Sequence, residues 1–143
     1  FFDSINILTR KADLVKAFRA TARALRPGGW YLFDAVTPRH TSGLWDYCER
    51  LHRGDGFLGF WDIEKVAAFH TVTVRMHWFI EQEDGLYARA EETHRIRGYA
   101  PEEIEAALEQ AGLTLVAAHE YDEDFLAQPR EETMRVDYVA RKK

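Results

Sequence analysis

The sequence has 143 residues, which is enough for a single domain with a sizeable core. Apolar residues make up 46% and charged residues 30%, as in ordinary globular proteins, and no apolar run approaches the length of a membrane span, so we expect no membrane association. The formal net charge of -5, with basic residues scattered among acidic ones, argues against a nucleic-acid partner.

The chain opens on "FFDSINIL", an apolar pair that runs directly into polar residues. We interpret this stretch as the tail of a strand whose beginning lies outside the sequence. The next residues, 11–25, carry apolar side chains at helical spacing with basic residues on the opposite face. This pattern predicts an amphipathic helix, with Thr9 as its N-cap and Asp13 in its first turns, where a negative charge is favourable.

A stop and a reversal follow this helix, because Pro27 cannot continue it and Gly28 or Gly29 can adopt a left-handed conformation. The next run, "WYLFDAV" (30–36), lacks polar alternation, as is typical of a strand covered on both faces in a parallel sheet. Strand tail, helix and strand make a β-α-β unit, whose strands end at one crevice. Five polar residues lie at or just past the two strand ends: Asp3, Ser4 and Asn6 after the first, and Asp34 and Thr37 at the end of the second.

The middle of the chain predicts a turn-rich loop over 39–56, with a short helix around "SGLWDYCERL", followed by antiparallel strands. Apolar and polar residues alternate in "FHTVTVRMHWFIEQ", "EDG" (83–85) is a hairpin turn signal, and "LYARAEETHRIRGY" is the return strand. "FLGFWDIEK" adds a third strand. The stretch "GDGFLG" matches a dinucleotide-binding glycine pattern, but strand-like residues follow it, so we interpret it as a loop or hairpin.

The last third predicts a helix over 100–112, with Pro101 in its first turn and Gly112 just past its end. Two final strands, "LTLVAAHEY" and "TMRVDYVARK", are joined by an acidic loop over 122–133. The acidic residues near His119 lack the order of metal ligands, so we expect no metal site. Cys48 is the single cysteine and cannot form an internal disulfide, which favours a cytoplasmic protein.

Several of these segments together resemble one known family. "FFDSINIL", "LRPGGWYLFDAVTP", the antiparallel strands and "EETHRIRGYAPEEIEAALEQAGL" are similar to the C-terminal part of class I S-adenosylmethionine-dependent methyltransferases. The resemblance implies an α/β fold: residues 1–143 form a single partial domain, the C-terminal portion of a Rossmann-like methyltransferase sheet, with an antiparallel β insertion at 57–99 that covers the acceptor side. The family's glycine-rich cofactor turn is not in this sequence, so the chain is expected to be a fragment without the N-terminal cofactor-binding half.

The resemblance implies methyl transfer from S-adenosylmethionine, the cofactor, to a small-molecule acceptor, with activity incomplete in this chain. A non-catalytic binding or assembly module with the same fold is the alternative. The sheet edge left by missing strands is expected to promote self-association. The candidate catalytic residues are Asp34, as a base if one is needed, and His94. The candidate cofactor contacts are Phe2, Asp3 and Asn6, and the candidate substrate contacts are Ser4, Thr37, Trp61 and Arg97.

Structural roles remain open for these residues. Asp34 and Thr37 can simply end a strand and cap a turn, and the strand that holds His94 and Arg97 can present a solvated, charged face. Five aromatic residues of the insertion can line an acceptor pocket or belong to the core: Phe57, Phe60, Trp61, Trp78 and Phe79.

Overall fold

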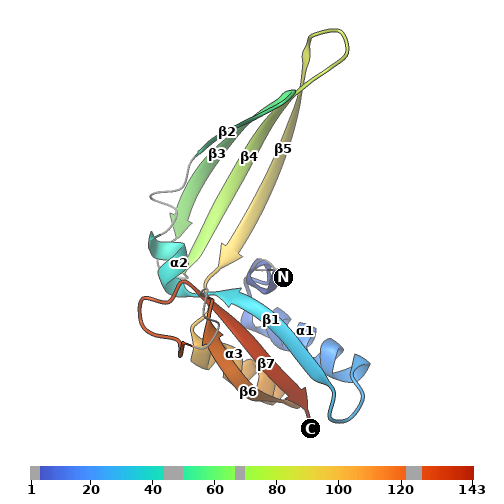
Figure 1. Cartoon of the computed structure of the whole chain (residues 1–143), viewed down its shortest axis with the longest axis vertical. Helices are drawn as coiled ribbons and strands as arrows, with labels where there is room; N and C mark the ends of the chain where they lie inside the picture. The colour runs from blue at the N-terminus through green and yellow to red at the C-terminus, as the bar shows by residue number, and fades with distance from the viewer. Residues whose placement is uncertain (1–3, 44–49, 67–69, 122–126) are drawn as a thin grey trace.

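The computed structural model describes residues 4–43, 50–66, 70–121 and 127–143. They form two parts, which we call the body and the arm; Figure 1 shows the arm projecting away from the body. The body contains η1 (Ser4–Ile7), α1 (Lys11–Ala24), β1 (Trp30–Val36), α3 (Pro101–Gln110), β6 (Leu113–Glu120) and β7 (Arg135–Lys142). The arm contains β2 (Leu51–Gly54), β3 (Phe57–Val66), β4 (Thr71–Glu81) and β5 (Tyr87–Arg97). A short helix, α2 (Pro38–Gly43), follows β1.

The first helix forms where its apolar spacing predicts it. Leu14, Phe18 and Ala22 are buried against the sheet of the body, and Asp13 lies in the first turn. The predicted cap is wrong: Arg10 is the N-cap residue, with no side-chain cap hydrogen bond. Its guanidinium instead pairs with the carboxylate of Asp13 at 2.6 Å.

The reversal after α1 is a turn over residues 26–29. The amide of Gly29 donates to the carbonyl of Arg26 at 2.8 Å, and Gly28 has a φ of +74°. Pro27 and Gly28 therefore occupy the central positions that a type II turn assigns to proline and glycine. The predicted reversal is confirmed, and it lies one turn beyond the end of the helix.

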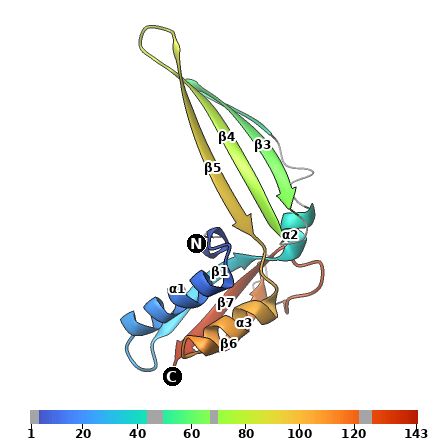
Figure 2. The ribbon, with the colours of Figure 1, turned by 180° about the vertical axis from the view of Figure 1, so that it is seen from behind.

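The sheet of the body has the strand order β1-β7-β6, and both pairings are antiparallel. β1 and β6 consequently run parallel to each other on either side of β7. This arrangement confirms the α/β fold, and it makes the last strand, β7, antiparallel to both of its neighbours. The two longer helices cover one face of this sheet, as the two opposite views show (Figures 1 and 2).

The expectation that both faces of β1 are covered is wrong for the start of the strand. Within the described residues β7 is its one strand neighbour, and Trp30 and Leu32 are 52% and 54% exposed. The opposite face of β1 is buried, because Phe33 and Ala35 pack with α1 and α3 in the main core. The strand tail predicted at residues 1–2 lies outside the described residues.

The arm is one antiparallel sheet in the order β2-β3-β4-β5, which confirms the antiparallel insertion. A fourth strand, β2, was not predicted; it pairs with β3 across a hairpin at Asp55 and Gly56, so "GDGFLG" is a hairpin. The turn at 83–85 joins β4 and β5 as predicted. The helix predicted around 42–51 is misplaced, because α2 begins earlier, at Pro38; residues 44–49 lie outside the described residues.

The two faces of the arm differ in character. One face, which we call the inner face, carries by register the following side chains: Val72, Val74, Met76, Trp78 and Ile80 of β4, Trp61 and Ile63 of β3, and Glu92, His94 and Ile96 of β5. The outer face carries ion pairs such as that of Arg75 with Asp62 and Glu64. The strict alternation breaks near the base, where Thr71 and Thr73 are also buried.

A close backbone approach joins arm and body. The amide of Tyr99 donates to the carbonyl of Val36 at 3.0 Å, and the amide of Gly98 donates to the carbonyl of His70 at 2.8 Å. A Cβ on Gly98 would lie 2.3 Å from the backbone oxygen of Thr37. Only glycine therefore fits between the end of β5 and the corner after β1.

Candidate functional site

The candidate site lies where the inner face of the arm meets the carboxyl end of β1. Val36 packs with Val72, Val74 and Ile96 in a second, smaller core. Because side chains alternate along a strand, Asp34 lies on the same face of β1 as Val36. The face of the body sheet opposite α1 and α3 thus continues into the inner face of the arm.

Asp34 is held in an ion pair. Its side chain is 4% exposed, and Oδ2 accepts a hydrogen bond from the Arg135 guanidinium at 3.0 Å. Asp137 stands directly opposite Asp34 across the β1–β7 pair. Burial raises the pKa of Asp137, and the charge of Asp34 raises it further. Because the Asp34 carboxylate is paired with Arg135, a positioning or structural role fits it better than the role of a general base.

Thr37 caps the corner after β1. Its hydroxyl donates to the carbonyl of Thr133 at 2.6 Å and lies 3.4 Å from the amide of His40. Its side chain is therefore engaged with the backbone at the corner, although the residue also lines a cavity of about 420 Å³ beside the start of α3. These contacts agree with the alternative that Thr37 caps the turn after β1.

His40 is a titratable group at the strand end that the sequence analysis missed. It is 7% exposed, and burial together with the charge of Arg135 lowers its pKa to about 4. A neutral imidazole thus lies at this end of β1 at ordinary pH. Its position two residues after Pro38, close to the end of the predicted strand, was the one available signal.

Asn6, a predicted cofactor contact, ties η1 to both parts of the chain. It is fully buried; its amide nitrogen donates to the carbonyls of Val36 (2.9 Å) and Arg97 (2.6 Å), and its oxygen accepts from the amide of Val36 at 2.9 Å. Both amide hydrogens are used, so Asn6 has no donor left for a cofactor. Ser4 is exposed, and the other two predicted cofactor contacts, Phe2 and Asp3, lie outside the described residues.

Arg97 points into the body. Its guanidinium donates to the carbonyl of Thr9 at 3.1 Å and to Glu103 at 3.1 Å, and it lies 4.8 Å from the ring centroid of Tyr99. Glu103 also pairs with Lys11 at 2.6 Å. Arg97 is thus part of a network that fixes the base of β5 to α1 and α3, and none of these contacts directs it toward a substrate.

His94 and Trp61 are the two predicted site residues that the inner face brings together. His94 is opposite Val74 and its Nε2 lies 3.4 Å from a Glu92 oxygen, while Trp61 is opposite Met76, one rung further from the body. The imidazole of His52 lies 4.1 Å from the Trp61 ring, measured between centroids. The Glu92 carboxylate and the His94 imidazole therefore lie on the same face of the arm as the Trp61 ring.

The five aromatic residues of the insertion divide between the two faces of the arm. By register, Phe57, Trp61 and Trp78 share the inner face, and Phe60 and Phe79 share the outer face. The Trp78 ring lies over Gly59, where an added Cβ would come within 2.5 Å of it. A single acceptor surface can therefore include three of the five.

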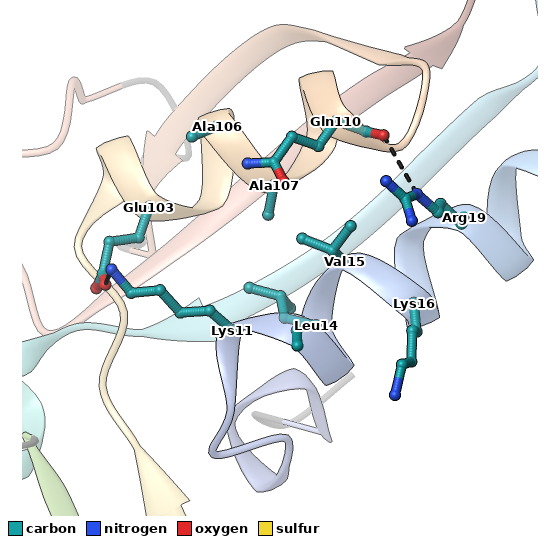
Figure 3. Close-up of a pocket in the computed structure, with 10 residues that line it drawn as sticks. Lys11, Leu14, Val15, Lys16, Arg19, Glu103, Ala106, Ala107 and Gln110 are labelled. Carbon is teal, nitrogen blue, oxygen red and sulfur yellow. Dashed lines mark hydrogen bonds and ion pairs between the residues drawn. The ribbon is translucent and has the colours of Figure 1, made fainter.

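A further cavity lies away from this site, in a groove of about 530 Å³ between α1 and α3 (Figure 3). Its floor is apolar, and cross-helix contacts close both ends: Lys11 with Glu103, and Arg19 with the carbonyl of Gln110 at 3.4 Å. No predicted site residue lines it. Within the described residues there is no cluster of potential metal ligands, and no helix is long and apolar enough to cross a membrane.

Comparisons with known proteins give a consistent result, although no family model matches the chain. A Geobacillus sp. (strain WCH70) protein with the provisional name of a methyltransferase is 26% identical over 143 residues, covering 99% of this chain and 57% of that protein. The protein YqeM of Bacillus subtilis, provisionally named in the same way, is 26% identical over 141 residues, covering 98% of this chain and 56% of that protein. The chain thus spans little more than half the length of these relatives.

Solved structures define the fold class. A crystal structure of an S-adenosylmethionine-dependent methyltransferase from Clostridium acetobutylicum matches with a TM-score of 0.82 at 23% identity, covering 99% of this chain and 55% of that one. The sugar N-methyltransferase KedS8 from a Streptoalloteichus species matches with a TM-score of 0.70 at 20% identity, covering 100% of this chain and 54% of that one. The fold is that of a portion of a Rossmann-like methyltransferase sheet with an antiparallel insertion.

These findings confirm the resemblance to S-adenosylmethionine-dependent methyltransferases. The partial coverage is consistent with a C-terminal part of such a protein.

Proposed function

We propose that this chain supplies the acceptor side of a methyltransferase that uses S-adenosylmethionine and methylates a small molecule. The observation that carries the proposal is the similarity, in sequence and in fold, of nearly the whole chain to methyltransferases. The strand order β1-β7-β6 and the apolar inner face beside the carboxyl end of β1 add support, because ligands of open α/β sheets bind at that edge.

For methyl transfer, the main task of the protein is to position the acceptor next to the methyl group. S-adenosylmethionine, when bound, supplies an activated methyl group. Because both amide hydrogens of Asn6 are already used, we assign its binding to other residues. Trp61 and Trp78 offer apolar surface on which an acceptor can be oriented. If the acceptor must lose a proton, His94 is better placed than Asp34 to take it, because its side chain is 41% exposed and faces the same surface.

The test uses the complete gene product, incubated with S-adenosylmethionine and a panel of small amines and phenols, with methylated product detected by mass spectrometry. We expect product with at least one acceptor, and His94→Gln to lower kcat while leaving the affinity for S-adenosylmethionine, measured by calorimetry, unchanged. His77→Gln is the matched control, because His77 lies on the outer face of the same strand pair. A gene product that binds no S-adenosylmethionine would refute methyl transfer and favour a binding or assembly module.

A further inference from the structure

The outer edge of β5 is the longest open strand edge of the arm. β5 has 11 residues, β4 is its one strand neighbour within the described residues, and its first seven residues, 87–93, are all exposed. The arm extends away from the body in both views, so the body leaves this edge open over residues 87–93, away from the base of the arm (Figures 1 and 2). Such an edge is a template for pairing with a further strand.

We propose that a second copy of this chain pairs with β5 in antiparallel fashion, about a two-fold axis at Ala90. A two-fold axis that extends a sheet in this way stands normal to it and keeps each face continuous, so it lies midway between the two copies of one residue. With the axis at Ala90, Arg89 lies opposite Glu91 of the second copy, and Tyr87 lies opposite its Thr93. The two copies then form one eight-stranded sheet with a shared inner face.

Among axes at residues 89–93, the charges of β5 favour this register. Like charges directly opposite each other destabilise a strand pair. An axis at Arg89 or Glu91 places that residue against itself, and an axis at Glu92 does the same. An axis at Thr93 places Arg89 against Arg97, which is already tied to Thr9 and Glu103 at the base of the arm. The Ala90 register alone among these five pairs two opposite charges twice and no like charges.

Two exposed charges at opposite ends of the arm, Glu81 at the tip and Arg95 near the base, support the same register. Within the described residues neither Arg95 nor the carboxylate of Glu81 has an ion pair or side-chain hydrogen bond, and both are exposed. Glu81 lines a cavity of about 440 Å³ together with Leu58, Phe79 and Tyr87. An axis at Ala90 brings Arg95 of the second copy opposite Gly85, on the face that carries Tyr87 and Glu81. A guanidinium fits this apolar hollow, against an aromatic ring and beside a carboxylate.

Cysteine cross-linking tests the register independently of any methyl transfer. In a Cys48→Ser background, Ala90→Cys places two thiols directly opposite each other, within disulfide reach. The matched control, Ala88→Cys, is on the same strand and face, but its two copies would be about 13 Å apart. We expect an oxidised dimer on non-reducing gels for Ala90→Cys and none for Ala88→Cys, with circular dichroism unchanged in both. Equal cross-linking of the two variants, or none, would overturn the proposal.

Light scattering after size-exclusion chromatography provides the second measurement. We expect the 143-residue chain to be a dimer, Arg95→Glu to raise the dissociation constant about tenfold, and the added exchange Glu81→Arg to restore dimerisation. A chain that is monomeric at all concentrations, or a charge exchange without rescue, would refute the interface.

Discussion

Replacing Asn6 with alanine is expected to lower the free energy of unfolding by about 3 to 5 kcal/mol. The fully buried amide satisfies three backbone groups: the N–H and C=O of Val36 and the C=O of Arg97. A buried backbone group that loses its partner costs about 1 to 3 kcal/mol, and partial relaxation keeps the total below the sum of three such costs. This loss is a large share of the 5 to 15 kcal/mol, roughly, that stabilises a typical domain.

Urea unfolding followed by circular dichroism and tryptophan fluorescence measures this loss. Ile7→Ala is the matched control, because Ile7 is in the same short helix but 55% exposed, and it should change stability by about 0.5 kcal/mol or less. A loss below about 1 kcal/mol for Asn6→Ala would show that water replaces the amide. The reasoning about a buried tie between arm and body would then be refuted.

Three further predictions concern the same junction. Gly98→Ala should cost about 1 to 3 kcal/mol in thermal unfolding because its Cβ meets backbone at 2.3 Å, and Gly43→Ala, with its nearest neighbour at 3.8 Å, should be nearly neutral; equal effects would contradict this. The pKa of His40 is lowered from 6.5 to about 4, so the unfolded chain binds more protons between these values. Stability should therefore fall by up to about 3 kcal/mol as pH falls through that window, and His40→Gln should flatten a pH series of urea unfolding. Alanine at Asp34 and Arg135, singly and together, should give a coupling energy of about 1 to 3 kcal/mol in a double-mutant cycle, and a value near zero would dismiss the ion pair.

Local signals in the sequence predicted most of the fold. Helical spacing of apolar residues located α1 and α3, alternation located β4, and Pro27-Gly28 located a turn that depends on conformations these two residues favour. Each of these features depends on residues that are neighbours in the chain. The strand β2 has four residues, none of them buried, and gave too short a pattern to detect.

The site was less predictable, because its polar residues are defined by partners far away in the sequence. Arg135 reaches Asp34 across 101 residues, and Arg97 reaches Thr9 across 88. A sequence pattern shows that such residues can carry chemistry, but not that their hydrogen-bonding capacity is already used. His94 differs, since its role depends mainly on strand alternation, which the sequence does show.

The contacts at the base of the arm hold it in a fixed position relative to the body and do not favour a hinge motion. Moving elements have few buried contacts and exposed backbone hydrogen bonds, whereas the base of this arm is joined to the body by the buried amide of Asn6 and by the Tyr99 hydrogen bond to Val36. The backbone around Gly98 is packed so closely that even a methyl group there would meet the Thr37 carbonyl, which leaves little room for a hinge motion. His94 lies two residues before Ile96, which packs in the same core as Val36, so its distance from the end of β1 is set by these contacts. An acceptor bound on the inner face would therefore meet a preformed surface, with access from the exposed distal end.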